Sequence, residues 1–119
     1  DNWVTLGKKF ANDFQVFLVD QRNHGQSFHD PAFSYDVMSE DLFRFMGELS
    51  LEKAHIIGHS MGGKTAMEFA RKYPDKIDKL IIADIGPKSY PIHHAAIIKA
   101  FYAVPINTLS TRKEGRYFK

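Results

Sequence analysis

The chain has 119 residues, of which 44% are hydrophobic and 25% are charged, and it contains no cysteine. Sixteen basic and fourteen acidic residues leave a net charge of +2 without a basic cluster, so the composition favours one globular unit or less and gives no reason to expect nucleic acid as a partner. The lack of cysteine excludes disulfide scaffolds and cysteine-based metal sites, and no apolar stretch reaches membrane-spanning length, so a cytoplasmic location is expected.

The two ends of the chain lead us to expect an internal portion of a larger domain. The pattern of Asp1 to Asn12 indicates a helix, whereas parallel α/β folds normally begin with a strand. The polar, helix-like stretch from Thr111 to Lys119 closes the chain without a final strand. We therefore expect this piece alone to leave strand edges and apolar faces uncovered, and to be poorly stable.

Three short apolar runs predict β-strands, at Gln15 to Asp20, Ala54 to Gly58 and Lys79 to Asp84. Their apolar residues are continuous rather than alternating, which is typical of strands that are buried on both faces of a parallel sheet. Helix-length segments separate the runs, and this alternation predicts an α/β fold with a partial parallel sheet of about three strands and right-handed crossovers.

Two helices are expected between these strands. The first begins near Ser34, a plausible N-cap, and the second runs from the end of the middle strand to about Tyr73, where Pro74 closes it. The residues expected to share one face are Leu42, Phe45, Met46 and Leu49 in the first helix, and Ala66, Met67, Ala70 and Tyr73 in the second.

A G-x-S-x-G pentapeptide, Gly58 to Gly62, joins the middle strand to the second helix. This strand-to-helix position is typical of a nucleophile elbow, in which glycines permit a tight turn and Ser60 is held in a strained conformation with its hydroxyl exposed. A serine becomes a nucleophile only when a base takes its proton and donors stabilise the oxyanion. The alternative is a glycine-rich turn with an idle serine.

Polar residues stand at the carboxyl ends of the three expected strands, where parallel sheets bind their ligands: Asp20, Ser60 and Asp84. Beyond them, Pro87, Pro91 and Pro105 interrupt an aromatic and aliphatic stretch. We therefore expect a core over residues 1–86 and the start of a helical cap or lid over residues 87–119.

Several motifs of the chain resemble the α/β-hydrolase superfamily. Asp20 to Ser27 (DQRNHGQS) resembles the D-x-R-x-x-G-x-S turn after the fourth strand of these enzymes, and Trp3 resembles the residue that follows their oxyanion loop. Together with Gly58 to Lys64 (GHSMGGK) and Ala83 to Pro87 (ADIGP), the combination is most similar to the bacterial YbfF-like esterases. The resemblance implies hydrolysis of short acyl esters, with acyl-CoA thioesters as further candidates, and no cofactor.

The resemblance also implies roles for individual residues. Ser60 would attack the ester carbonyl, and the backbone N–H of Met61 would give one oxyanion hydrogen bond. The second donor would come from a loop upstream of Asp1. Asp84 matches the position from which some members take the triad acid. Other members take the acid from a strand beyond the cap domain. In that second case, Asp84 would only cap the turn that follows its strand.

The histidine that serves as base comes late in this fold, so we expect it outside the chain. His59 is expected to pack beside the serine or to line the pocket, and His24 to lie at the pocket rim or to make a structural hydrogen bond. Asp20 and Arg22 are expected to fix their loop by an ion pair. The spacing of histidines and carboxylates favours no metal site.

The function predicted from these residues is a serine hydrolase that cleaves small-molecule carboxylic esters or thioesters through an acyl-enzyme on Ser60. A second possibility is a relative with other triad chemistry, such as a thioesterase, a haloperoxidase-like enzyme or a C–C bond hydrolase. A third, of a different class, is a binding protein on a hydrolase fold whose catalytic parts have decayed.

Overall fold

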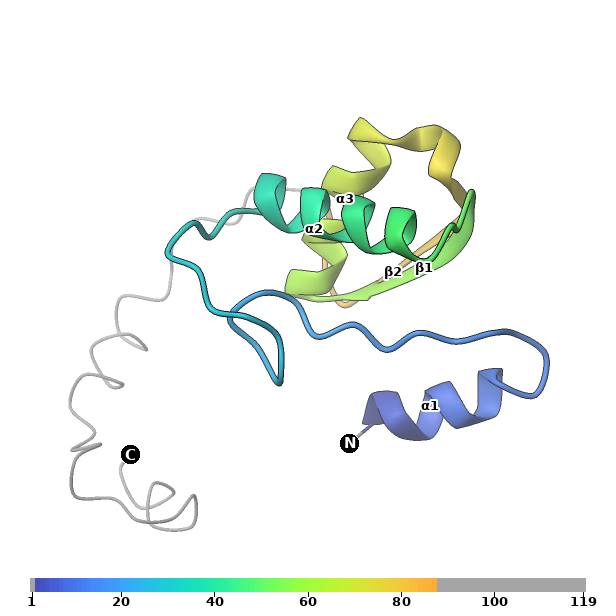
Figure 1. Ribbon diagram of the computed structural model, residues 1–119. Helices are drawn as coiled ribbons and strands as arrows, with labels where there is room; N and C mark the ends of the chain where they lie inside the picture. Colours follow the sequence, from blue (N-terminus) through green and yellow to red (C-terminus); the bar gives the residue numbers. More distant parts are fainter. Residues whose placement is uncertain (1, 88–119) are drawn as a thin grey trace, which may run out of the picture. The chain divides into compact units, whose positions relative to one another are not determined.

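The structure is a computed structural model that describes residues 2–87 (Figure 1). In chain order its elements are the helices α1 (Asn2–Phe10) and α2 (Tyr35–Glu48), strand β1 (Ala54–His59), helix α3 (Met61–Lys72), the short 3-10 helix η1 (Pro74–Lys76) and strand β2 (Ile77–Ala83). The expected cap, apart from Pro87, lies outside the described residues. Among residues 2–87, no helix is long and apolar enough to cross a membrane.

A β1–α3–β2 unit forms the centre of this part of the chain. The two strands pair in parallel, with Ile57 opposite Ile81 and His59 opposite Ala83. Helix α3 packs against both strands, and α2 packs against α3. The alternation of strands and helices in the sequence therefore predicted the α/β class and the parallel pairing correctly.

The core lies between α2 and α3. Its buried apolar side chains are Met38 and Met46 from α2, and Ala66 and Phe69 from α3, of which Phe69 has no exposed surface. Helix α3 contacts strands on one side and α2 on another, so its buried residues extend beyond the single stripe that we expected. Of the expected faces, Ala66 and Met46 are buried, whereas Leu49, at the C-cap of α2, is exposed.

The expected strand at Gln15 to Asp20 is wrong for the described structure. The segment has no regular secondary structure, and the side chains of Phe17, Leu18 and Val19 are 38%, 51% and 48% exposed. A strand needs a neighbour with which to form its hydrogen bonds, and neither β1 nor β2 pairs with this segment. The described residues thus form a sheet of two strands instead of three.

The expected burial of the strands on both faces is also wrong within residues 2–87. Ile57 and Ile81, paired across β1 and β2, are 39% and 50% exposed. The burial of β1 alternates along the strand because α3 covers only one face of the pair. The continuous apolar runs nevertheless contain the side chains that a second covering layer would bury.

An ionic cluster joins α2 to the end of α3. The Lys72 ammonium donates hydrogen bonds to Asp36 Oδ1, at 2.9 Å, and to Glu40 Oε1, and the Tyr73 hydroxyl donates to Glu40 Oε1 at 2.6 Å. The hydrogen bonds from Lys72 and then from Tyr73 lower the pKa of Glu40 below its ordinary value. The ionised Glu40 carboxylate therefore helps to hold the two helices together.

This cluster predicts a specific acid sensitivity. The pKa of Glu40 is lower in the folded than in the unfolded protein, so the ionised carboxylate stabilises the fold. This contribution to stability is fully present above the unfolded pKa of about 4.3, and it is lost as the pH falls through the folded pKa. Glu40→Gln should lower the melting temperature at pH 7 and flatten its decline below about pH 4.3. Circular dichroism melts from pH 3 to 7 would measure this, with the exposed Glu52→Gln as control. The prediction would be contradicted if the melting temperatures of Glu40→Gln and the parent fell in parallel as the pH is lowered.

Candidate active site

Ser60 forms the junction between β1, which ends at His59, and α3, which begins at Met61. Its backbone has φ 51° and ψ −116°, a positive φ that is uncommon for a residue with a side chain and that is typical of strained functional sites. The Ser60 N–H donates to the Ala83 carbonyl at 3.0 Å, and the Ser60 carbonyl accepts from the Lys64 N–H at 3.1 Å. The side chain makes no capping hydrogen bond and the residue is exposed, so the hydroxyl is accessible at the carboxyl end of the sheet.

Gly58 is required by the close approach of two backbone segments at this junction. A Cβ atom at position 58 would overlap the carbonyl oxygen of Gly62 and would lie 2.8 Å from the Cα of Gly63. These are main-chain atoms, which cannot move aside as the end of a flexible side chain can. The tight turn expected from the outer glycines is therefore observed, and its cause is contact between the end of β1 and the first turn of α3.

Gly58→Ala should destabilise the protein by about 3 kcal/mol, because the added methyl group would press two backbone segments apart. Gly47→Ala is a matched control: a Cβ atom there would have nothing within 4 Å, and alanine should stabilise the end of α2 by up to about 1 kcal/mol. Urea unfolding followed by fluorescence would measure both. Equal midpoints for the two variants would show that the elbow tolerates a side chain at position 58.

Met61 is the first residue of α3, directly after Ser60. The first four N–H groups of a helix have no partner within the helix, and the aligned peptide dipoles make this end partially positive. The Met61 N–H is therefore a suitable donor to an oxyanion formed next to Ser60.

Asp84 follows β2 directly and also has a positive φ, of 58°. Its carboxylate Oδ2 lies 3.4 Å from Nε2 of His59, and the two side chains are 81% and 49% exposed. The rings of His59 and Trp3 make a T-shaped contact with a centroid distance of 6.3 Å. Since Ser60 bonds to Ala83, the residue before Asp84, the two strand ends bring His59, Ser60 and Asp84 to one edge of the sheet.

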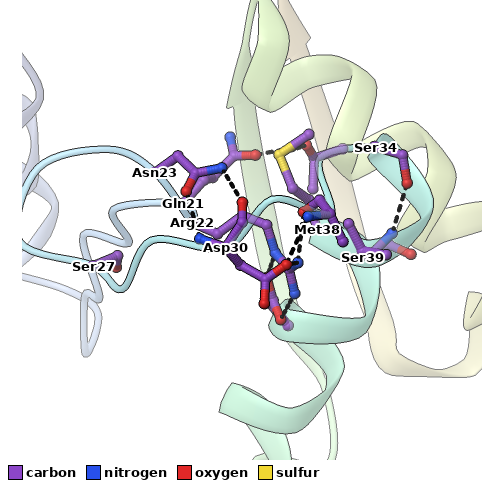
Figure 2. A network of polar contacts seen from close by, with 12 residues as sticks. Gln21, Arg22, Asn23, Ser27, Asp30, Ser34, Met38 and Ser39 are labelled. Atoms are coloured by element: carbon purple, nitrogen blue, oxygen red, sulfur yellow. Dashed lines mark hydrogen bonds and ion pairs between the residues drawn. The ribbon is translucent and has the colours of Figure 1, made fainter.

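The expected ion pair between Asp20 and Arg22 is wrong. Arg22 instead makes a two-pronged contact with Asp41 in α2, from Nε to Oδ2 at 2.5 Å and from Nη2 to Oδ1 at 2.7 Å (Figure 2). The remaining guanidinium nitrogen, Nη1, donates a hydrogen bond to the carbonyl oxygen of Ala32 at 2.8 Å. The planar guanidinium matches a carboxylate that can accept two parallel bonds, whereas the Asp20 carboxylate is engaged by the N–H of Gln26 at 3.1 Å. Arg22 therefore binds α2 through Asp41 and the loop through Asp30, whose Oδ1 lies 3.4 Å from Nη1, rather than pairing with Asp20.

Comparison with protein families matches residues 1–105 to the alpha/beta hydrolase fold. The chain belongs to the α/β-hydrolase fold family. It is 39% identical over 116 residues to esterase YbfF of Escherichia coli, covering 97% of this chain and 46% of that protein. It is 45% identical over 94 residues to the sn-1-specific diacylglycerol lipase ABHD11 of Mus musculus, covering 77% of this chain and 31% of that protein.

Among solved structures, a marine microorganism esterase superposes on this α/β-hydrolase chain with a TM-score of 0.85 and 46% identity. The match covers 95% of this chain and 46% of that structure. The chain thus spans less than half the length of these relatives. The resemblance expected from the DQRNHG and GHSMGGK motifs, to the superfamily and to its YbfF-like esterases, is confirmed.

The structure gives His24 a structural hydrogen bond. Its Nδ1 lies 2.9 Å from the carbonyl oxygen of Arg22, and its ring stacks on Phe33 at a centroid distance of 6.1 Å. The ring is exposed, so a place at the rim of a substrate pocket stays a prediction. No group of three or more metal-ligating side chains occurs within residues 2–87.

One contact at this site was not predictable from the sequence. The Thr65 hydroxyl in α3 donates to the side-chain Oε1 of Gln21, in the loop 44 residues earlier, at 2.7 Å. A pair so far apart along the chain leaves no periodicity or local motif. Gln21 lies inside the D-x-R-x-x-G-x-S motif, but at one of its variable positions.

Proposed function

We propose that the protein is a serine hydrolase that cleaves carboxylic esters of short to medium acyl chains through an acyl-enzyme on Ser60. The observation that carries the proposal is the exposed serine at positive φ between a parallel strand and a helix N-terminus. Relatives that are named esterase and lipase support the same reaction class. A cytoplasmic location is part of the proposal.

The proposed reaction has two steps, in each of which a carbonyl carbon is attacked. The Ser60 oxygen adds to the ester carbonyl while a base removes its proton, and the Met61 N–H stabilises the oxyanion that forms. The oxyanion collapses, the C–O bond of the ester breaks, and the alcohol leaves with the proton held by the base. Water then attacks the acyl group on Ser60 in the same way and releases the carboxylic acid.

Asp84 is proposed as the acid that orients the base and stabilises its protonated form. Its carboxylate lies at the same sheet edge as Ser60, one residue after the carbonyl to which the Ser60 N–H is bonded. His59 is proposed to line the site beside Asp84, whose carboxylate lies 3.4 Å from its Nε2, rather than to act as the base. The base and the second oxyanion donor are proposed to come from outside this chain.

Labelling with a fluorophosphonate probe tests the proposal directly. The probe forms a covalent bond only with a serine that is activated as a nucleophile, so it should modify Ser60 in the native protein and should not modify the heat-denatured protein. Mass spectrometry of the peptide that contains Gly58 to Lys64 would locate the adduct. An unlabelled native protein would instead support a binding protein on a hydrolase fold. With labelling established, comparing oxygen esters and thioesters of one acyl chain would separate esterase from thioesterase activity.

A further inference from the structure

We infer that Gln21 and Thr65 are positioning residues for the oxyanion donor at the first turn of α3. The inference rests on the proposed function, because it assigns these side chains to the placement of the Met61 N–H. Neither side chain contacts Ser60 in the interactions described above, so neither is proposed to take part in bond making.

The Thr65 hydroxyl has two oxygen acceptors within reach and one proton to donate. Gln21 Oε1 lies at 2.7 Å, whereas the carbonyl of Met61, one helical turn back, lies at 3.3 Å. Thr65 is only 5% exposed, so water cannot readily replace a lost partner. Without Gln21, the remaining acceptors would be the Met61 carbonyl and the weakly accepting Sδ of Met38, at 3.8 Å. The hydroxyl would then favour the Met61 carbonyl, a back-bond that bends helices.

Gln21 also lies near the helix at a second point. A Cβ atom on Gly62 would lie 3.2 Å from Gln21 Nε2, so the amide group lies close beside the backbone of Gly62. The Gln21 amide therefore has its Nε2 near the backbone of Gly62 and its Oε1 bonded to Thr65, both in α3. This placement restricts how the first turn can tilt relative to Ser60.

The loop that carries Gln21 is held in place by the two residues that follow it. The next residue, Arg22, makes the two-pronged contact with Asp41 of α2 (Figure 2). Asn23 is bonded in both directions to Asp30, through its Nδ2 to the Asp30 carbonyl at 3.0 Å and its Oδ1 from the Asp30 N–H at 2.8 Å. Helix α2 thus fixes the loop, and the loop fixes the first turn of α3 through Gln21.

Loss of the contact between Gln21 and Thr65 should weaken the stabilisation of the transition state more than it weakens substrate binding. A displacement of about 1 Å in a catalytic group can cost about a hundred-fold in rate, and the loss of an entire oxyanion donor costs about a hundred- to a thousand-fold. We expect a partial displacement in Gln21→Ala, with kcat about ten-fold lower and KM changed less than about two-fold. Thr65→Val, which removes the hydroxyl at constant shape, should give a similar loss.

The test measures kcat and KM for p-nitrophenyl butyrate in the complete protein, together with inhibition by a trifluoromethyl ketone, whose adduct with serine carries an oxyanion. The ketone should bind more weakly in proportion to the fall in kcat for Gln21→Ala and Thr65→Val. Thr65→Ser should restore most of the rate because it keeps the hydroxyl. Combining Gln21→Ala with Thr65→Val should cost little more than either alone, since both remove the same hydrogen bond.

Gln26→Ala is the matched control. Gln26 lies in the same loop and is exposed, and its bond to Asp20 uses the backbone N–H, which alanine keeps. Its kcat should equal that of the parent. A kcat within two-fold of the parent in Gln21→Ala, or a Thr65→Ser variant as slow as Thr65→Val, would overturn the inference. A parent that neither hydrolyses esters nor accepts the fluorophosphonate probe would overturn the proposed function, and this inference with it.

Discussion

Ser60→Ala should lower the kcat for ester hydrolysis by about a million-fold, the scale of loss seen when a serine protease loses its nucleophile. Alanine has no oxygen to form the acyl-enzyme, and only binding and oxyanion stabilisation remain to accelerate attack by water. Turnover of p-nitrophenyl butyrate at high enzyme concentration would measure the residual rate. A variant that keeps more than about a tenth of the parent rate would show that the reaction does not pass through Ser60.

The same substitution should leave the fold intact, which makes the loss of activity interpretable. The Ser60 side chain makes no capping hydrogen bond, and the bonds to Ala83 and from Lys64 use backbone atoms that alanine retains. Ser50→Ala is a matched control, because Ser50 is also exposed and has a positive φ of 54°. Both variants should keep the melting temperature of the parent, and only Ser60→Ala should lose activity.

Local patterns in the sequence predicted the parts of the fold that depend on neighbours in the chain. The cap at Ser34 is an example: its hydroxyl accepts a hydrogen bond from the Val37 N–H at 3.3 Å at the start of α2. Helix α3 ends at Lys72 as the position of Pro74 predicted, and the elbow lies between β1 and α3. In each case a short motif contains both partners of the interaction that decides the structure.

Interactions between distant segments were not predictable in the same way. The apolar run at Gln15 to Asp20 has the composition of a strand, but pairing depends on a neighbour whose identity the run does not contain. Arg22 had a carboxylate two residues away, yet its partners are Asp41, 19 residues later, and Asp30. A salt bridge depends on which carboxylate the fold brings into line with the guanidinium, and that requires the packing of the loop against α2.

Asp84→Asn should lower kcat by about ten-thousand-fold, the loss seen when the triad aspartate of a serine protease becomes asparagine. The substitution removes the charge that stabilises the protonated base but keeps the size of the side chain. Asparagine also tolerates the positive φ of 58° at this position and can cap a turn as aspartate does. If Asp84 only capped the turn after β2, the variant would therefore keep nearly all of the parent activity, and the triad acid would lie later in the complete protein.

Two further variants complete this test. Asp78→Asn changes an exposed aspartate on the same strand and should leave kcat unchanged. His59→Ala removes the imidazole that lies 3.4 Å from the Asp84 carboxylate, and it should cost at most about ten-fold, because the proposed base comes from elsewhere in the protein. A loss in His59→Ala as large as that in Ser60→Ala would identify His59 as the base. The relative order of the three losses therefore assigns the acid and separates the base from a residue that only lines the site.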